Sequence, residues 1–182
     1  MLITEKTTVR RKMRERRKSL SLCDRDAFDL AICEKLMRLT DRRSPVAVYL
    51  ASSDEISIDR YIESLLLGGY VVVSPRWNGR EYELAKVEDL ESGSLRRGPM
   101  DIREPCGVSL VSPRDVALWI VPGLAFTRDG FRLGYGGGWY DRLLSKASPS
   151  APRIGVAYSF QIVDSLPVEP HDIMLTGVVD EK

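Results

Sequence analysis

The chain has 182 residues, of which 43% are hydrophobic and 29% are charged, a composition typical of one compact globular domain. Its three widely spaced cysteines, Cys23, Cys33 and Cys106, do not form the pattern of a disulfide framework or a zinc ribbon and favour reduced thiols. No stretch approaches the roughly 18 apolar residues of a membrane span, and the N-terminus is charged where a secretory signal would be apolar. We therefore expect residues 1–182 to form a single cytoplasmic domain that acts as a monomer and has no membrane partner.

The net charge of +1 is unevenly distributed along the chain. Residues 1–18 hold eight Lys and Arg against two Glu, a net charge of +6, so the remaining residues sum to −5. Such a basic end attracts polyanions, including nucleic acid, a nucleotide or a polyglutamate tail. The alternative is a solvated face of a helix.

Apolar residues at steps of about four positions predict two helices, over residues 5–20 and 24–39, which we expect to pack antiparallel. These residues are Val9, Met13 and Leu20 in the first helix and Phe28, Ile32 and Leu36 in the second. A strand over 45–50 is followed by a helix that Ser53 or Asp54 caps and Gly68-Gly69 ends, and then by a strand over 70–75. This order predicts parallel pairing with a right-handed crossover.

The second half of the chain continues the alternation of strands and helices. Asn78-Gly79 predicts a hairpin or an edge strand up to Val87, and residues 88–115 are rich in the residues of loops and turns. Further strands are expected over 115–122, 153–158 and 173–180, with a helix from Trp139 to Ala147. The pattern favours an α/β fold: an open, mostly parallel sheet flanked by helices in a Rossmann-like three-layer sandwich.

Residues 121–144, VPGLAFTRDGFRLGYGGGWYDRLL, form the most informative segment. Gly134, Gly136, Gly137 and Gly138 let the backbone turn so that successive N–H groups can point at one phosphate. A helix beginning at Trp139 would add its own N–H groups, and Arg132 could supply a bidentate cation. A tight turn packed against a sheet would use the same glycines.

Two familiar nucleotide motifs are absent from the sequence. No Gly-Lys-Ser/Thr occurs, which excludes the P-loop. A dinucleotide fingerprint would follow its strand directly and meet an acidic residue after the next strand, and neither condition holds here.

The string PGLAFTRDGFRLGYGGGWYDR resembles the signature of the 5-formyltetrahydrofolate cyclo-ligase family. Three more segments fall where that family has them: Lys6-x-x-x-Arg10, YLASSDEI (49–56) and GVAYSFQIVDSLPVEPHDI (155–173). The resemblance spans nearly the whole chain. It implies ATP-dependent conversion of 5-formyltetrahydrofolate, with or without a polyglutamate tail, to 5,10-methenyltetrahydrofolate, ADP and phosphate.

The resemblance implies that ATP is held by the basic N-terminal helix and the glycine loop. The matching residues are Lys6, Arg10, Arg14, Arg132, Leu133, Gly134, Tyr135, Gly136, Gly137, Gly138, Trp139 and Tyr140, of which Arg132 and Tyr140 are the expected catalytic residues. Helical geometry supports this role for Lys6, Arg10 and Arg14, because residues four apart share one face. Solvated surface is the expectation for Arg11, Lys12, Arg16 and Arg17.

For the folate, the resemblance implies a hydrophobic contact from Leu50 and a carboxylate contact from Glu55. A carboxylate can accept hydrogen bonds from two adjacent pterin donors. The alternative for Glu55 is an acid in the first turn of a helix, favoured by the helix dipole. The residues of the glycine loop that also border the folate are Tyr135, Gly136, Gly137, Gly138 and Trp139, although the aromatic ones could be ordinary core.

Magnesium is the second implied cofactor, with Asp141 and Asp172 as its matching residues. Carboxylates and phosphate oxygens suit this hard ion. Asp141 could instead be an acid of a first helical turn, and Asp172 a turn former. The sole histidine, His171, is expected to be a turn residue rather than a catalyst.

The implied mechanism is phosphorylation of the formyl oxygen by ATP, followed by attack of N10 and departure of phosphate, with no protein nucleophile. Two departures from the family pattern occur: Gly137 where some members have lysine, and Thr127 where aspartate is common. The first motivates an alternative, a nucleotide-binding regulator of the same fold without folate activity. Nucleic-acid binding is a weaker alternative, because no reading motif accompanies the basic segment, and we expect no such partner.

Overall fold

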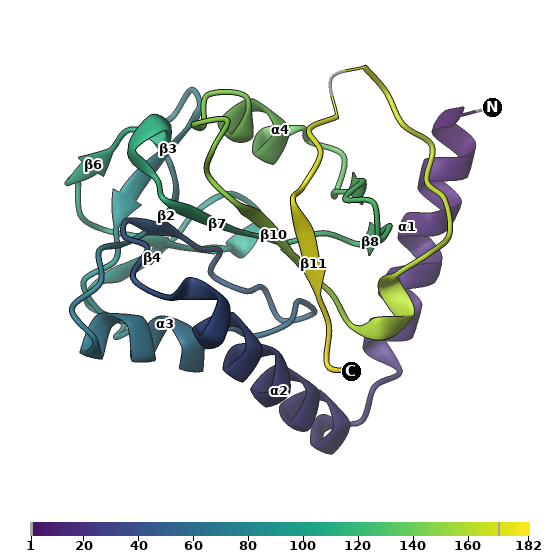
Figure 1. Cartoon of the computed structure of the whole chain (residues 1–182), viewed down its shortest axis with the longest axis horizontal. Coiled ribbons are helices and arrows are strands. Elements are labelled where there is room, and N and C mark those ends of the chain that lie inside the picture. The colour runs from purple at the N-terminus through teal and green to yellow at the C-terminus, as the bar shows by residue number, and fades with distance from the viewer. Residues whose placement is uncertain (1, 171) are drawn as a thin grey trace.

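The computed structural model describes residues 2–170 and 172–182, and a seven-stranded sheet forms its centre (Figure 1). The strand order is β11-β10-β7-β1-β2-β3-β6. The bounds of these strands along the chain are β1 Val46–Ala47, β2 Val72–Trp77, β3 Tyr82–Lys86, β6 Leu110–Val111, β7 Leu118–Val121, β10 Arg153–Val156 and β11 Gly177–Val179. The five strands from β11 to β2 are parallel, whereas β3 and β6 add an antiparallel edge, so the prediction of a mostly parallel sheet is confirmed.

Four α-helices and several short elements complete the described chain. The helices are α1 Leu2–Lys18, α2 Leu22–Thr40, α3 Asp59–Leu67 and α4 Trp139–Leu144. Two small ribbons lie outside the main sheet and pair β4 Leu95–Arg97 with β5 Arg103–Pro105, and β8 Ala125–Phe126 with β9 Arg132–Leu133. Short 3-10 turns cover Pro99–Asp101, Pro113–Asp115 and Ser159–Gln161. The segment 88–115, predicted as loops and turns, therefore also contains three short strands.

Alternation along the central strands builds the three layers. In β7, Leu118 and Ile120 pack in one core with the buried residues of α2 and α3, whereas Trp119 and Val121 pack with α4 on the opposite face. Successive side chains of a strand point to opposite faces, so a strand that is apolar throughout needs cover on both. The predicted sandwich is confirmed, and Figure 1 shows α2 and α3 below the sheet and α4 above it.

The hairpin expected near Asn78 is present between β2 and β3. The side-chain oxygen of Asn78 accepts hydrogen bonds from the N–H groups of Arg80 and Glu81, at 2.9 and 3.0 Å. Gly79 has a φ of +102°, a conformation that L side chains rarely adopt. The Asn-Gly pair thus closes the turn in the way its chemistry predicts.

Helix α1 stands apart from the other helices. Its Met13 packs with Leu124, Ala125 and Leu133 around the β8–β9 ribbon, whereas α2 packs against the main sheet and α3. Figure 1 shows α1 and α2 leaving their short connection in different directions. The prediction that they pack as an antiparallel pair is wrong, because their apolar faces are covered by different partners.

The predicted start of the third helix is also wrong. Helix α3 begins at Asp59 after the N-cap residue Ile58, so neither Ser53 nor Asp54 caps it. The polar groups of this segment are satisfied within a turn instead, where Glu55 N–H donates to Ser52 O at 3.2 Å. The helix ends at Gly68 as predicted.

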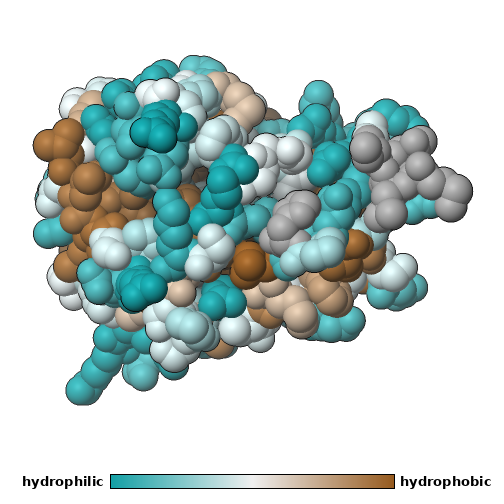
Figure 2. All heavy atoms as spheres, turned by 90° about the horizontal axis from the view of Figure 1, so that it is seen from above, coloured by the Kyte–Doolittle hydropathy of each residue, from teal (hydrophilic) through white to brown (hydrophobic). Residues whose placement is uncertain are grey.

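The outer surface is mostly polar. Figure 2 shows apolar residues gathered at the end of the molecule where β6 lies in Figure 1, and the exposed fractions of Val108 and Leu110 are 73% and 52%. Within the described residues, the helices are too short or too polar to cross a bilayer.

Arg17 contradicts the expectation of a solvated side chain, because it is only 1% exposed. Its guanidinium donates to Gly123 O and, at 2.7 Å, to the Tyr135 hydroxyl. Arg17 follows Met13 by four positions and therefore shares the inward face of α1. The buried guanidinium therefore connects α1 by hydrogen bonds to Gly123, before the β8–β9 ribbon, and to Tyr135, in the glycine loop.

We predict that Arg17→Leu destabilises the fold by about 3 kcal/mol, because Gly123 O and the Tyr135 hydroxyl lose a charged donor inside the protein. Thermal unfolding should then shift downward by roughly 10 °C. The matched control is Arg11→Leu on the same helix, where the side chain is 69% exposed and the expected change is within about 0.5 kcal/mol. Equal destabilisation by the two substitutions would contradict this role of Arg17.

Candidate functional site

A cavity of about 500 Å³ opens where the chain leaves the carboxyl ends of β1 and β7. In parallel sheets this edge is the usual place for ligands. Every residue that the sequence predicted for the site lines this cavity: Lys6, Arg10, Arg14, Leu50, Glu55, Arg132, Leu133, Gly134, Tyr135, Gly136, Gly137, Gly138, Trp139, Tyr140, Asp141 and Asp172. Segments from both ends of the chain and from its middle therefore converge on one space.

The glycine loop connects β9 to α4. Gly136 and Gly138 have φ values of +109° and +64°, in the region where a side chain is strained. Gly138 is the N-cap of α4, which has only six residues and is shorter than the predicted helix to Ala147. A Cβ on Gly137 would lie 2.7 Å from the Trp139 indole, so the aromatic ring fills the space that a longer side chain would need.

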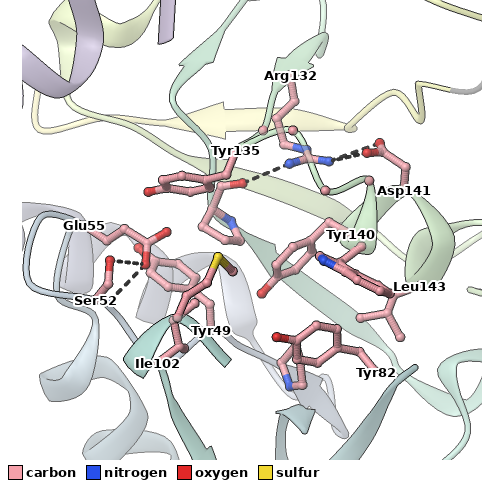
Figure 3. Close-up of a pocket in the computed structure, with 18 of the residues that line it drawn as sticks. Tyr49, Ser52, Glu55, Tyr82, Ile102, Arg132, Tyr135, Tyr140, Asp141 and Leu143 are labelled. Carbon is pink, nitrogen blue, oxygen red and sulfur yellow. Dashed lines mark hydrogen bonds and ion pairs between the residues drawn. The ribbon is translucent and has the colours of Figure 1, made fainter. Parts of the chain in front are cut away.

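Arg132 forms the polar centre of one side of the cavity. Its Nη2 lies 3.0 Å from both carboxylate oxygens of Asp141, and its side chain is 4% exposed. Asp141 is in the first turn of α4, as the alternative interpretation required, and it also accepts a 3.4 Å hydrogen bond from Ile173 N–H. Figure 3 shows this pair across the cavity from Glu55 and Ser52.

Three cations of α1 reach the cavity in different ways. Lys6 is buried, and its Nζ lies 2.6 Å from Glu169 Oε2 and 3.3 Å from Asp172 Oδ2. Arg10 donates from Nε to Gly134 O at 2.9 Å, and the Arg14 guanidinium lies 5.5 Å from the centre of the Tyr135 ring. Burial disfavours the charged form of Lys6, but its hydrogen bonds to the two carboxylates outweigh this effect and raise the pKa of Lys6. Lys6 therefore stays charged.

The opposite side of the cavity is built around Glu55, which is 8% exposed. Its Oε2 accepts hydrogen bonds from the Ser52 N–H at 3.0 Å and from the Ser52 hydroxyl at 2.9 Å (Figure 3). Because α3 begins only at Asp59, the alternative of a first-turn helix acid is wrong for Glu55. The Ser52 turn fixes one carboxylate oxygen, and the Tyr135 hydroxyl also interacts with Glu55, while the two oxygens together can accept about four hydrogen bonds.

Two tyrosines that line the cavity have strongly perturbed hydroxyl groups. Burial, with the Glu55 charge as the next cause, raises the pKa of Tyr140 far above its usual range. The same two causes raise the pKa of Tyr135, whose hydroxyl accepts a hydrogen bond from Arg17. Both phenols therefore keep their protons, and each can act as a hydrogen-bond donor but not as a base.

Sequence reasoning missed several residues of the cavity wall. Five of them come from β3 and from the segment predicted as loops: Tyr82, Met100, Ile102, Arg103 and Glu104. Glu104 is 1% exposed and pairs with Arg96 at 3.2 Å, and Tyr82 packs edge-on against Trp139 with ring centres 5.3 Å apart. Nothing local in the sequence marks them, because they reach the site only through the pairing of short strands. Glu169 was missed although it lies within the C-terminal segment that resembles the family.

The predicted magnesium residues lie in ion pairs with cations. Within residues 2–170 and 172–182, His, Cys, Asp and Glu side chains form no group of three or more that could hold a metal ion. Asp172 accepts from Glu169 N–H at 2.8 Å, which is the turn-forming role considered for it. The interpretation of His171 as a turn residue falls outside the described residues.

Known proteins match this chain over nearly its whole length. The model of the 5-formyltetrahydrofolate cyclo-ligase family matches residues 3–181. The 5-formyltetrahydrofolate cyclo-ligase of Escherichia coli is 34% identical over 147 residues, which cover 74% of this chain and 76% of that protein, and the enzyme of the same name from Mycoplasma pneumoniae is 25% identical over 98% and 99% of the two chains. Among solved structures, 5,10-methenyltetrahydrofolate synthetase from Aquifex aeolicus superposes with a TM-score of 0.85 at 32% identity, covering 97% of this chain and 90% of that one. The family match, these relatives and the shared fold together establish that the chain belongs to the 5-formyltetrahydrofolate cyclo-ligase family of ligases.

Proposed function

We propose that this chain uses ATP and Mg²⁺ to close the 5-formyl group of 5-formyltetrahydrofolate onto N10, giving 5,10-methenyltetrahydrofolate, ADP and phosphate. A single cavity of about 500 Å³ supports this proposal, because the cations of α1 and the glycine loop line one side of it and Glu55 lines the other. Phosphoryl transfer between two substrates requires them to share one enclosed space, because reactants must be held in contact and in the correct orientation. Family membership implies the use of ATP.

The triphosphate belongs at the side formed by α1 and the glycine loop. Lys6, Arg10 and Arg14 lie four residues apart on α1 and reach this side together. Gly136 and Gly138 adopt positive φ without strain because they lack a Cβ, and the missing side chains support close approach of a ligand to the main chain. Positive side chains next to accessible backbone N–H groups are the combination that binds polyphosphates in proteins.

The chemistry of Asp141 and Asp172 fits a magnesium ion that is shared with phosphate. Both offer carboxylate oxygens, and the Ile173 N–H that donates to Asp141 belongs to the residue directly after Asp172. Mg²⁺ is usually held by one or two carboxylates together with phosphate oxygens and water, so a complete protein cage is not required. When bound there, the ion would neutralise charge on the phosphates.

The pterin belongs on the Glu55 side. Glu55 is held by Ser52, and Leu50, Tyr82 and Ile102 line the same cavity, with Ile102 on the Glu55 side in Figure 3. A buried carboxylate can accept from adjacent N–H groups of a planar ring, and the apolar walls pack against the faces of that ring. In this proposal the 5-formyl group faces the glycine loop, which lines the same cavity.

In the proposed reaction the formyl oxygen takes the γ-phosphoryl group, and ADP departs. N10 then bonds to the formyl carbon, the carbon–oxygen bond breaks with loss of phosphate, and the N10 proton is released. Arg132 supports the transfer by placing a buried positive charge beside the loop. Tyr140 keeps its proton. Its hydroxyl donates a hydrogen bond to a substrate oxygen on which negative charge develops during the reaction.

The direct test mixes the purified chain with 5-formyltetrahydrofolate, ATP and Mg²⁺ and follows the absorbance of the methenyl product. We expect product only when ATP is present, with ADP and phosphate formed in equal amounts. Binding of ATP without any methenyl product would instead favour the regulator of the same fold.

We predict that Glu55→Gln raises KM for 5-formyltetrahydrofolate about 10- to 100-fold, the equivalent of roughly 1.5–3 kcal/mol for hydrogen bonds to a charged group. Glutamine keeps an oxygen for Ser52 but presents an amide donor to the pterin donors. KM for ATP should stay within about twofold. Steady-state kinetics with Glu63→Gln, an exposed substitution on α3, provide the control, and a rise in KM for ATP alone would refute the assignment of Glu55.

We predict that Tyr140→Phe lowers kcat about tenfold and that this ratio to wild type stays constant from about pH 7 to about pH 10. Because the pKa of Tyr140 is raised far above its usual value, the hydroxyl keeps its proton across this range and loses no donor capacity as pH rises. A ratio that rises toward unity above about pH 9 would show that Tyr140 ionises there and that wild type loses the same donor.

A further inference from the structure

The cationic side of the cavity contains a lysine that the protein itself already neutralises. Lys6 Nζ lies 2.6 Å from Glu169 Oε2 and 3.3 Å from Asp172 Oδ2, and all three residues line the cavity. The Lys6 side chain is only 10% exposed. A triphosphate that binds here therefore meets a cation with two carboxylate partners in place.

The two carboxylates hold Lys6 under different constraints. Asp172 Oδ2 also accepts the Glu169 N–H at 2.8 Å, and the Asp172 side chain is 19% exposed, so a turn of the chain fixes it. The Glu169 side chain is 46% exposed and makes the shorter contact with Lys6. Glu169 is thus the more solvent-accessible of the two carboxylate partners of Lys6 and the one in closer contact with its ammonium group.

The position of α1 does not depend on the Lys6 contacts alone. Met13 packs against the β8–β9 ribbon, Arg10 donates to Gly134 O, and the buried Arg17 donates to Gly123 O. Release of Lys6 from Glu169 thus leaves the helix anchored by three other residues. The lysine side chain can change its partner while the backbone beneath it stays in place.

We propose that Glu169 is a positioning residue that holds Lys6 through their ion pair and gives it up to the phosphates of the bound nucleotide. This inference rests on the proposed binding of ATP at this side of the cavity. Glu169 and the triphosphate then compete for the same ammonium group. Removal of the carboxylate strengthens nucleotide binding, which is the opposite of what the loss of a merely structural contact would do.

The experiment compares Glu169→Gln with wild type by isothermal titration calorimetry, with ATP as the titrant in the presence of saturating Mg²⁺. We expect the Kd to fall about fivefold, the equivalent of losing a competing ion pair of ordinary strength. Steady-state kinetics should show a lower KM for ATP, with kcat within about twofold. The control is Glu34→Gln, which removes the same charge from the exposed Arg38 pair on α2 and should leave the Kd unchanged.

Lys6→Met separates competition for the lysine from a general effect of charge. If Glu169 acts through Lys6, adding Glu169→Gln to Lys6→Met should change the Kd for ATP by less than about twofold. A fivefold gain in both backgrounds would mean that any negative charge near the phosphates weakens binding, and it would overturn the proposal. The comparison of Glu169→Gln with wild type stands by itself if the Lys6 variant does not fold.

Titration with adenosine distinguishes the phosphates from the rest of the nucleotide. Adenosine lacks phosphates, so its Kd should be the same for wild type and Glu169→Gln. Weaker ATP binding by Glu169→Gln, or unchanged ATP binding, contradicts the role of Glu169. Failure of the wild-type chain to bind ATP at all contradicts the proposed function instead, so the two failures are distinguishable.

Discussion

The site depends on the attachment of α1 to the segment that carries the glycine loop. Arg17, 1% exposed, donates both to Gly123 O before the β8–β9 ribbon and to the Tyr135 hydroxyl after it. A buried guanidinium stays charged, so it is stable inside a protein only where several acceptors surround it. The Met13 contacts then fix the rotation of the helix, and this rotation turns Lys6 and Arg10 toward the cavity.

Opposite charges that line the cavity are paired with one another. Arg132 meets Asp141, and Lys6 meets Asp172 and Glu169. Such pairing reduces the cost of holding unbalanced charges together in a partly buried space. If nucleotide and metal bind as proposed above, the cations would exchange carboxylate partners for phosphates and the carboxylates would turn to the metal, so few buried groups would be left unpaired.

The two sides of the cavity differ in how firmly they are built. The Glu55 side rests on the sheet: Leu50 follows β1, and the Ser52–Glu55 turn leads into the buried Ile56 and Ile58. The side formed by α1 and the C-terminal segment is joined by side-chain contacts between distant parts of the chain. Under the proposed function, the planar ring would occupy the side built on the sheet and the phosphates the side built from distant segments, so that a phosphoryl group can pass from one substrate to the other within one cavity.

Much of the architecture and the content of the site follow from the sequence alone. Apolar runs such as Leu118–Val121 specify buried parallel strands, the Asn78-Gly79 pair specifies the hairpin, and the glycine-loop string identifies the family. These signals are local, because each depends on residues close together in the chain. Three features were decided only by tertiary structure: the burial of Arg17, the late start of α3 after the Glu55 turn, and the pairing of Lys6 with Glu169 across 163 positions. Their physical cause is non-local. Whether a charged residue is solvated, paired or available to a ligand depends on which distant segments pack against it. The spacing of residues along the sequence does not contain this information.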